Sequence, residues 1–167
     1  MTIHDDILHE LGEIEHHLHN YERWWGATPA PNTANAILMG VDNPHVVISG
    51  NNTWGAAVPV VGRLDNPVRT IDNIFDIHRI TIADPDNATM WLLRFLWGTE
   101  SLEEAAQAQR WSAIEMIASG VGSNISTPGI NMVTDRMPVG STVWAQGWNV
   151  TNLAELSFFH GCHGYVT

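Results

Sequence analysis

The sequence predicts a mainly β fold, an antiparallel, jelly-roll-like β-sandwich with a short N-terminal amphipathic helix and one short inserted helix. From residue 36 onward, short apolar runs rich in β-branched and aromatic residues alternate with Gly, Asn, Asp and Pro. Long helices do not alternate with these runs, which argues against a parallel βαβ arrangement. At 167 residues, the chain is long enough to bury one core of its own.

The N-terminal segment carries a heptad pattern, with apolar side chains at alternating intervals of four and three. These side chains are Ile7, Leu11, Ile14, Leu18, Tyr21 and Trp25. A mean spacing of about 3.5 residues keeps one narrow stripe facing a partner helix. We therefore expect residues 1–27 to form a helical arm whose stripe is an oligomer interface. The competing interpretation is that the helix packs along its own β domain, because about three heptads are marginal for pairing alone.

Pro29 and Pro31 end the helical pattern, and the β domain is expected over residues 28–167. The predicted strands are 36–41, 45–49, 56–61, 77–83, 89–97, 110–118, 130–134, 142–150 and 153–160.

One segment between the predicted strands has the pattern of a helix instead. Ser101, followed three residues later by Glu104, makes a capping box before an Ala-rich run, which predicts a short helix over 101–109.

Charge and composition narrow the possible partners. The chain has 18 acidic and 7 basic residues, all of the latter Arg, for a formal net charge of −11. Nucleic-acid binding requires basic side chains that neutralise phosphates, so no nucleic-acid partner is expected. No stretch approaches the roughly 20 apolar residues of a membrane span, so no membrane partner is expected either. The lone cysteine, Cys162, rules out an intrachain disulfide framework.

The strongest candidate for chemistry lies near the C-terminus, where His160, Cys162 and His163 fall within four residues. Such residues are metal ligands, but a complete site would need His45, His78 or an Asp from another strand. Because the chain has no second Cys, this is a weak signal. The favoured interpretation is a terminal strand whose glycines permit a bulge or a close approach of another strand.

The remaining motifs predict no enzyme. His16, His17 and His19 do not have the i, i+4 spacing that converges on a metal in a helix. A phosphate-binding Gly-rich loop, Gly-x-Ser-x-Gly and His-Glu-x-x-His are all absent from the sequence. The predicted strands also lack the His-x-His pattern of cupin-type enzymes, since the His-x-His spacing of His17 and His19 lies in the N-terminal segment. We therefore expect no catalytic residue, no metal and no cofactor.

Eight Trp residues are too many for one core of this size, which indicates contact surface. Trp91, Trp97 and Trp111 share runs with Leu and Ile and are expected in the core. Trp144 and Trp148 fall on the same side of one predicted strand. We expect these two to form a partner-binding face or a subunit contact.

Three stretches carry a resemblance to a known class of protein. They are Tyr-Glu-Arg-Trp-Trp-Gly at 21–26, Asn-Ile-Phe-Asp-Ile-His-Arg-Ile-Thr-Ile at 73–82, and Met-Trp-Leu-Leu-Arg-Phe-Leu-Trp-Gly at 90–98. With a last strand carrying His and Tyr over 158–165, the chain resembles small virion proteins of tailed bacteriophages. Those proteins decorate or cement capsids or serve as minor head components. The short inserted helix is the part that does not match.

The resemblance implies a homotrimer that is made in the host cytoplasm and binds the major capsid protein on the outer capsid surface. Outward display agrees with the acidic charge, because packaged DNA would repel it. The leading expectation is thus a non-enzymatic virion structural protein. One alternative is a carbohydrate- or receptor-binding module of a tail or fibre. Another is a metal-dependent jelly-roll enzyme.

Overall fold

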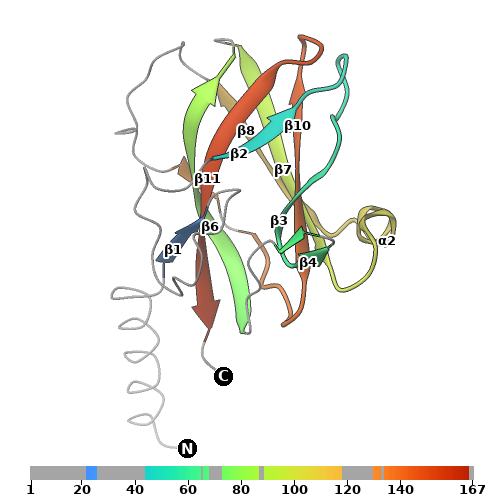
Figure 1. The fold of residues 1–167 in the computed structure, drawn as a ribbon, viewed down its shortest axis with the longest axis vertical. Helices are drawn as coiled ribbons and strands as arrows, with labels where there is room; N and C mark the ends of the chain where they lie inside the picture. The colour runs from blue at the N-terminus through green and yellow to red at the C-terminus, as the bar shows by residue number, and fades with distance from the viewer. Residues whose placement is uncertain are drawn as a thin grey trace, which may run out of the picture.

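The computed structural model describes residues 22–25, 44–64, 66–67, 73–86, 89–117, 130–132 and 134–165. For 22–25, 63–64, 66–67, 84 and 117 only the backbone is described. These residues form a mainly β fold, in which two antiparallel sheets lie on either side of a shared core (Figure 1). The prediction of a mainly antiparallel β protein is confirmed.

The first sheet is organised around the long last strand, β11 (Glu155–Tyr165). Its order is β1 (Glu22–Trp25), β11, β6 (Ile74–Pro85) and β9 (Ile130–Asn131). The other early strand, β2 (His45–Ile48), shares an edge of β11 with β1. β2 pairs with residues 155–158, and β1 with residues 160–163. β11 therefore has a partner along most of both edges.

The second sheet has the order β3 (Val58–Val61), β10 (Thr142–Asn149), β7 (Met90–Gly98) and β8 (Trp111–Ile117). All of its pairings are antiparallel. A short two-stranded ladder of β4 (Arg63–Leu64) and β5 (Asn66–Pro67) follows β3. β7 and β8 are neighbours in both sequence and sheet, and the helix α2 (Leu102–Gln107) connects them.

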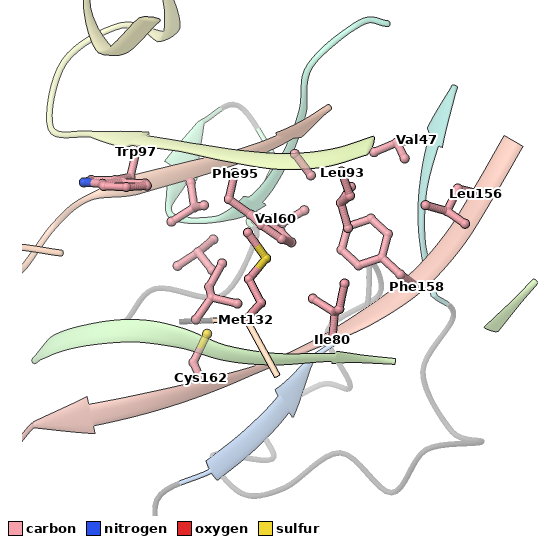
Figure 2. Close-up of a cluster of buried hydrophobic side chains, with 14 of the residues drawn as sticks. Val47, Val60, Ile80, Leu93, Phe95, Trp97, Met132, Leu156, Phe158 and Cys162 are labelled. Carbon is pink, nitrogen blue, oxygen red and sulfur yellow. The ribbon is translucent and has the colours of Figure 1, made fainter. Parts of the chain in front are cut away.

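The core forms where alternate side chains of the two sheets meet. Figure 2 shows Leu93 and Phe95 of β7 pointing towards Phe158 of β11 and Ile80 of β6, and all four are fully buried. Phe95 meets Phe158 edge to face, with ring centroids 5.8 Å apart. Burying a side chain of this size contributes about 1.5–3 kcal/mol, so these contacts hold the sheets together.

Gly147 allows β2 to approach β10 closely. A Cβ at this position would lie 2.9 Å from Cγ2 of Val47 and 3.3 Å from Cζ3 of Trp91. The missing side chain therefore makes room for two core residues, one from each sheet.

The inserted helix is confirmed and begins as the sequence predicts. The Ser101 hydroxyl accepts a hydrogen bond from the backbone N–H of Glu104, whose carboxylate accepts one from the backbone N–H of Ser101. The helix buries Ala105 against Leu96 and Trp144, in a second small apolar cluster on the outer side of the second sheet. α2 thus covers part of this sheet's outer face.

The strands predicted from residue 45 onward are confirmed, with ends that shift by a few residues. The predicted strand 36–41 lies outside the described residues. β11 continues beyond the predicted end at His160, through two glycines to Tyr165. The glycines do not stop it because β6 supplies hydrogen-bond partners along this stretch.

The N-terminal prediction needs one correction. Glu22–Trp25, expected in the helical arm, form strand β1 and pair with β11. Trp25 therefore does not belong to a helical stripe, because the backbone hydrogen bonds offered by β11 favour an extended conformation. The other stripe residues, Ile7, Leu11, Ile14, Leu18 and Tyr21, lie outside the described residues. Within the described part of the chain, no helix has the length and apolar character needed to cross a membrane.

The two-sheet core makes a matched prediction about stability. Leu93 is fully buried, whereas Leu153 is 68% exposed. Leu93→Ala should lower the free energy of unfolding by about 2–5 kcal/mol, because it leaves a cavity between the sheets. Leu153→Ala should change it by less than about 0.5 kcal/mol. Urea unfolding at neutral pH measures both, and equal losses would contradict the assignment of the core.

Candidate functional site

A β-bulge in the β6–β11 pair builds the first candidate site. The register shifts between Gly161 and Cys162, so that Gly161 pairs with Arg79 and Cys162 with Ile77. His78 lies between these two pairs, opposite the shift. The glycines of this segment were predicted to permit a bulge or a close approach of another strand, and the pairing is irregular at Gly161, where the extra residue, His78, belongs to β6. Bulges re-aim side chains, and this one sets which residues of the two strands share a face.

Three side chains with metal-ligating atoms meet beside this bulge. Asp76 and His163 are direct register partners, and His78 lies two residues from Asp76. One ligand atom from each of the three lies within 4.8 Å of the others. The rings of His78 and His163 pack against each other, with centroids 4.1 Å apart and planes 30° apart. We call Asp76, His78 and His163 the carboxylate–histidine cluster.

The carboxylate of this cluster is buried and only partly satisfied. Asp76 is 4% exposed, and its Oδ2 accepts a 2.5 Å hydrogen bond from the Tyr165 hydroxyl. Its Oδ1 accepts no hydrogen bond from the described residues and lies 3.8 Å from Nδ1 of His163. The guanidinium of Arg136 lies over the Tyr165 ring, 4.1 Å from its centroid.

The buried Asp76 carboxylate helps to raise the pKa of two neighbouring groups, Tyr165 and Cys162. Burial, the hydrogen bond to Asp76 and the charge of Asp76 together raise the pKa of Tyr165 to about 12. Burial, aided by the charge of Asp76, raises the pKa of the Cys162 thiol well above its usual value. Tyr165 therefore stays protonated as the hydrogen-bond donor. Cys162, which packs in the core (Figure 2), stays a neutral thiol.

The structure divides the histidines and cysteine that the sequence placed in one candidate group. His163 joins His78, which was proposed by name to complete the site, and Asp76, which lies on another strand as the prediction required but was not named. His160 and Cys162 instead face the core. The sequence therefore identifies residues with metal-ligating atoms, but not the strand register that brings three of them together. The lone His78, expected to be structural, is a member of the cluster.

A second pair of imidazoles lies inside the core. His45 of β2 and His160 of β11 are both buried, with ring centroids 5.0 Å apart. Phe158 and Phe95 pack beside them, with centroids 5.5 Å from His45 and 6.4 Å from His160 respectively. Burial lowers the pKa of His45 from 6.5 to about 4. His45 is therefore neutral in the folded protein at neutral pH.

The second candidate site is the outer face of the second sheet. The guanidinium of Arg94 lies 4.2 Å from the centroid of the Trp54 ring and 5.8 Å from that of Trp111. Gln146 accepts hydrogen bonds from Nε and Nη2 of Arg94, at 2.9 and 2.6 Å, and donates one to the Gly55 carbonyl. Burial lowers the pKa of Arg94.

This surface joins three strands and one loop. Trp54 forms an isolated antiparallel bridge with Trp148 of β10, which holds the loop before β3 on the sheet. Trp111 begins the edge strand β8 and is 43% exposed. We call the surface formed by Trp54, Arg94, Trp111, Gln146 and Trp148 the indole face. It combines exposed aromatic area with a fixed cation.

The structure confirms Trp91 and Trp97 as core residues but not Trp111. Ile114 and Met116 of β8 pack in the core, and residues two apart share a face, so an odd-numbered residue of this strand points outward. Trp144 and Trp148, predicted as one binding face, have different environments. Trp144 is 4% exposed beneath α2, whereas Trp148 is half-buried on the indole face.

The buried imidazole pair predicts a pH dependence of stability. The pKa of His45 is about 4 in the folded protein and about 6.5 unfolded, so the unfolded chain binds the proton more tightly. Stability should therefore fall as the pH drops through this window. The loss from His45 alone should be about 3 kcal/mol between pH 7 and pH 4.

The measurement is urea unfolding at several pH values, for the wild type and for His45→Leu. The wild type should lose about 3 kcal/mol more than the variant on acidification. Leu96→Ala is the control, because it removes packing in the second apolar cluster, away from His45, and no titratable group. Its loss of stability should be the same at every pH. Parallel curves for the wild type and His45→Leu would refute the assignment.

Comparison with known protein families, with curated proteins and with solved structures gives no significant match. The functional argument therefore rests on the geometry of the chain. Two features carry it, the carboxylate–histidine cluster on the first sheet and the indole face on the second.

Proposed function

We propose that the chain is a non-enzymatic virion structural protein of a tailed bacteriophage, which decorates or cements the outer surface of the capsid as a homotrimer. Its fold would be a jelly-roll-like β-sandwich, and its main partner the major capsid protein. The observation that carries the proposal is the indole face, where an exposed Trp lies beside an Arg packed between two indole rings.

The composition of the indole face is typical of a protein contact. Trp and Arg are the residues most enriched among those that dominate binding energies. Arg94 is held by Gln146 and by the Trp54 ring, so little side-chain entropy remains to be lost when a partner binds. Trp111 offers apolar area next to this fixed cation, as an anchor for a pocket on the capsid surface.

The charge of the chain supports the outer surface of a capsid over the inner one. A net charge of −11 is unfavourable near packaged DNA and tolerable in solvent. Copies of such an acidic protein also repel one another. Apolar contacts, through the indole face or the N-terminal heptad stripe, would have to offset that repulsion on an assembled shell.

A carbohydrate- or receptor-binding module is the second candidate, and the same surface supports it. On β8, Trp111, Ala113 and Glu115 are all exposed and point to one side. Trp111 and Glu115 lie about 13 Å apart along the strand, so the indole can stack on one sugar ring while the carboxylate accepts hydrogen bonds from the hydroxyl groups of a neighbouring sugar. Binding to shells and binding to glycans separate the two candidates.

The indole face predicts the effect of one substitution on capsid binding. Trp111→Ala should weaken co-sedimentation with assembled shells by about 2 kcal/mol, or roughly 30-fold in affinity. Its thermal unfolding should change little, because the ring is largely outside the core. Leu153→Ala removes another exposed apolar side chain and should leave binding intact.

Three outcomes are informative. Loss of binding in Trp111→Ala alone supports the proposal. Failure of the wild type to bind shells overturns it. Binding of the wild type to a glycan array, abolished by the same substitution, favours the carbohydrate-binding candidate.

The heptad stripe makes a separate prediction about self-association. Leu11→Asp combined with Leu18→Asp should convert the oligomer to a monomer while leaving the β domain folded, because it places charges in the apolar stripe. Analytical ultracentrifugation measures this, and circular dichroism reports the fold. The control is His9→Asp with His16→Asp, which adds acidic residues outside the stripe. An unchanged sedimentation coefficient in the Leu double variant would reject the stripe as the contact.

A further inference from the structure

The carboxylate–histidine cluster has the donor atoms of a transition-metal site. Its two imidazole nitrogens and one carboxylate oxygen come from neighbouring strands and lie within 4.8 Å of one another. Imidazole suits zinc and the neighbouring first-row divalent ions, whereas calcium and magnesium prefer sites made of oxygen atoms. The two nitrogens and one oxygen therefore favour zinc or a neighbouring first-row divalent ion over calcium or magnesium.

The buried carboxylate is an independent observation that points to a cation. The Asp76 side chain is 5% exposed, and its Oδ1 accepts no hydrogen bond from the described residues. A buried carboxylate is unfavourable unless it is paired or bound to metal. Its ion-pair partner among the described residues is His163, whose Nδ1 is 3.8 Å from Oδ1, beyond hydrogen-bond distance, while the Arg136 guanidinium lies over the ring of Tyr165, which donates to the other oxygen. The space beside Oδ1 is thus where positive charge is most favoured.

We propose that Asp76, His78 and His163 bind one divalent transition-metal ion, with Zn²⁺ preferred, and that the ion fastens β11 to β6 beside the bulge. Tetrahedral zinc with bonds of about 2.0–2.1 Å requires ligand atoms roughly 3.3 Å apart. The Oδ1–Nδ1 distance of 3.8 Å is already near this value. The rings of His78 and His163, which now pack against each other with centroids 4.1 Å apart, would have to separate and turn so that one nitrogen of each points at the ion.

The surroundings of Asp76 already orient its carboxylate for this role. Tyr165 donates its hydroxyl hydrogen to Oδ2, and the other oxygen, Oδ1, lies 3.8 Å from Nδ1 of His163. Hydrogen bonds of this kind to a ligating group fix its orientation and are a regular feature of metal sites.

Neighbouring candidates for ligation are excluded by their position. The side chain of Cys162 lies in the core, on the opposite face of β11. His45 and His160 also lie in the core. Three protein ligands leave a coordination position for water or for a group of a partner. The competing explanation is an ion pair between protonated His163 and Asp76, which needs no metal.

The test uses the full chain, stripped of metal with a chelator and titrated with ZnCl₂ in a calorimeter. One Zn²⁺ should bind per chain. At free zinc about 100 times its dissociation constant, the ratio of folded to unfolded protein should rise about 100-fold, which thermal unfolding detects. MgCl₂ and CaCl₂ should have no effect. Absence of zinc binding would overturn the proposal in favour of the ion pair.

Matched variants assign the ligands. His78→Gln, at a half-buried position, should weaken zinc binding by about 100-fold or more, since loss of an outer-shell partner alone costs about 10–100-fold. Asp76→Asn should abolish binding too. Without metal, however, it should be no less stable than the wild type, because it removes a buried charge while keeping an acceptor for Tyr165. That combination distinguishes loss of a ligand from loss of the fold.

The N-terminal histidines supply the control. A variant with His16→Gln, His17→Gln and His19→Gln should bind zinc as the wild type does. Loss of binding in this variant, with binding retained in His78→Gln and Asp76→Asn, would overturn the proposed site. None of these results depends on capsid binding, so the metal site and the proposed function succeed or fail separately.

Discussion

Pairing between β6 and β11 is the contact on which the other features of the molecule depend. It runs from Leu156 opposite Pro85 to Tyr165 opposite Ile74, and so joins the end of the described chain to its middle. β1 and β2 then pair with the outer edge of β11, and the inward side chains of both long strands meet the second sheet. If these two strands separated, the first sheet would no longer hold together. The core would then lose one of the two sheets that enclose it.

The same strand presents different chemistry on its two faces. Cys162 and His160 point into the core, where burial keeps the thiol protonated and the nearby His45 neutral. His163 and Tyr165 belong to the opposite face and surround the Asp76 carboxylate. Successive side chains of a strand point to opposite faces, so β11 can present core residues on one face and polar residues on the other. The register shift between Gly161 and Cys162 sets which residues of β6 lie beside each face. Residues 160–165 therefore contribute both to the hydrophobic core and to the carboxylate–histidine cluster.

Local signals made much of the fold predictable. Alternating apolar runs identified the strands from residue 45 onward, and Ser101 with Glu104 identified α2, because these patterns depend on near neighbours. The carboxylate–histidine cluster depends instead on register between strands, and Tyr165 contacts Asp76 across 89 residues. Trp111 was wrongly predicted to lie in the core. The positions of Ile114 and Met116 already indicate that the even-numbered residues of this strand face the core and the odd-numbered ones face outward. Glu22–Trp25 continue a helical pattern in sequence, but pairing with β11 makes them a strand.

The lone cysteine has a consequence for how motion in this sheet can be followed. Cys162 is sequestered between the sheets, and a thiol reagent attacks only the thiolate of an accessible side chain. The rate at which such a reagent labels the chain is therefore limited by separation of β11 from the opposite wall. Thiol labelling of Cys162 therefore reports local opening between β11 and the second sheet, and it needs no added probe.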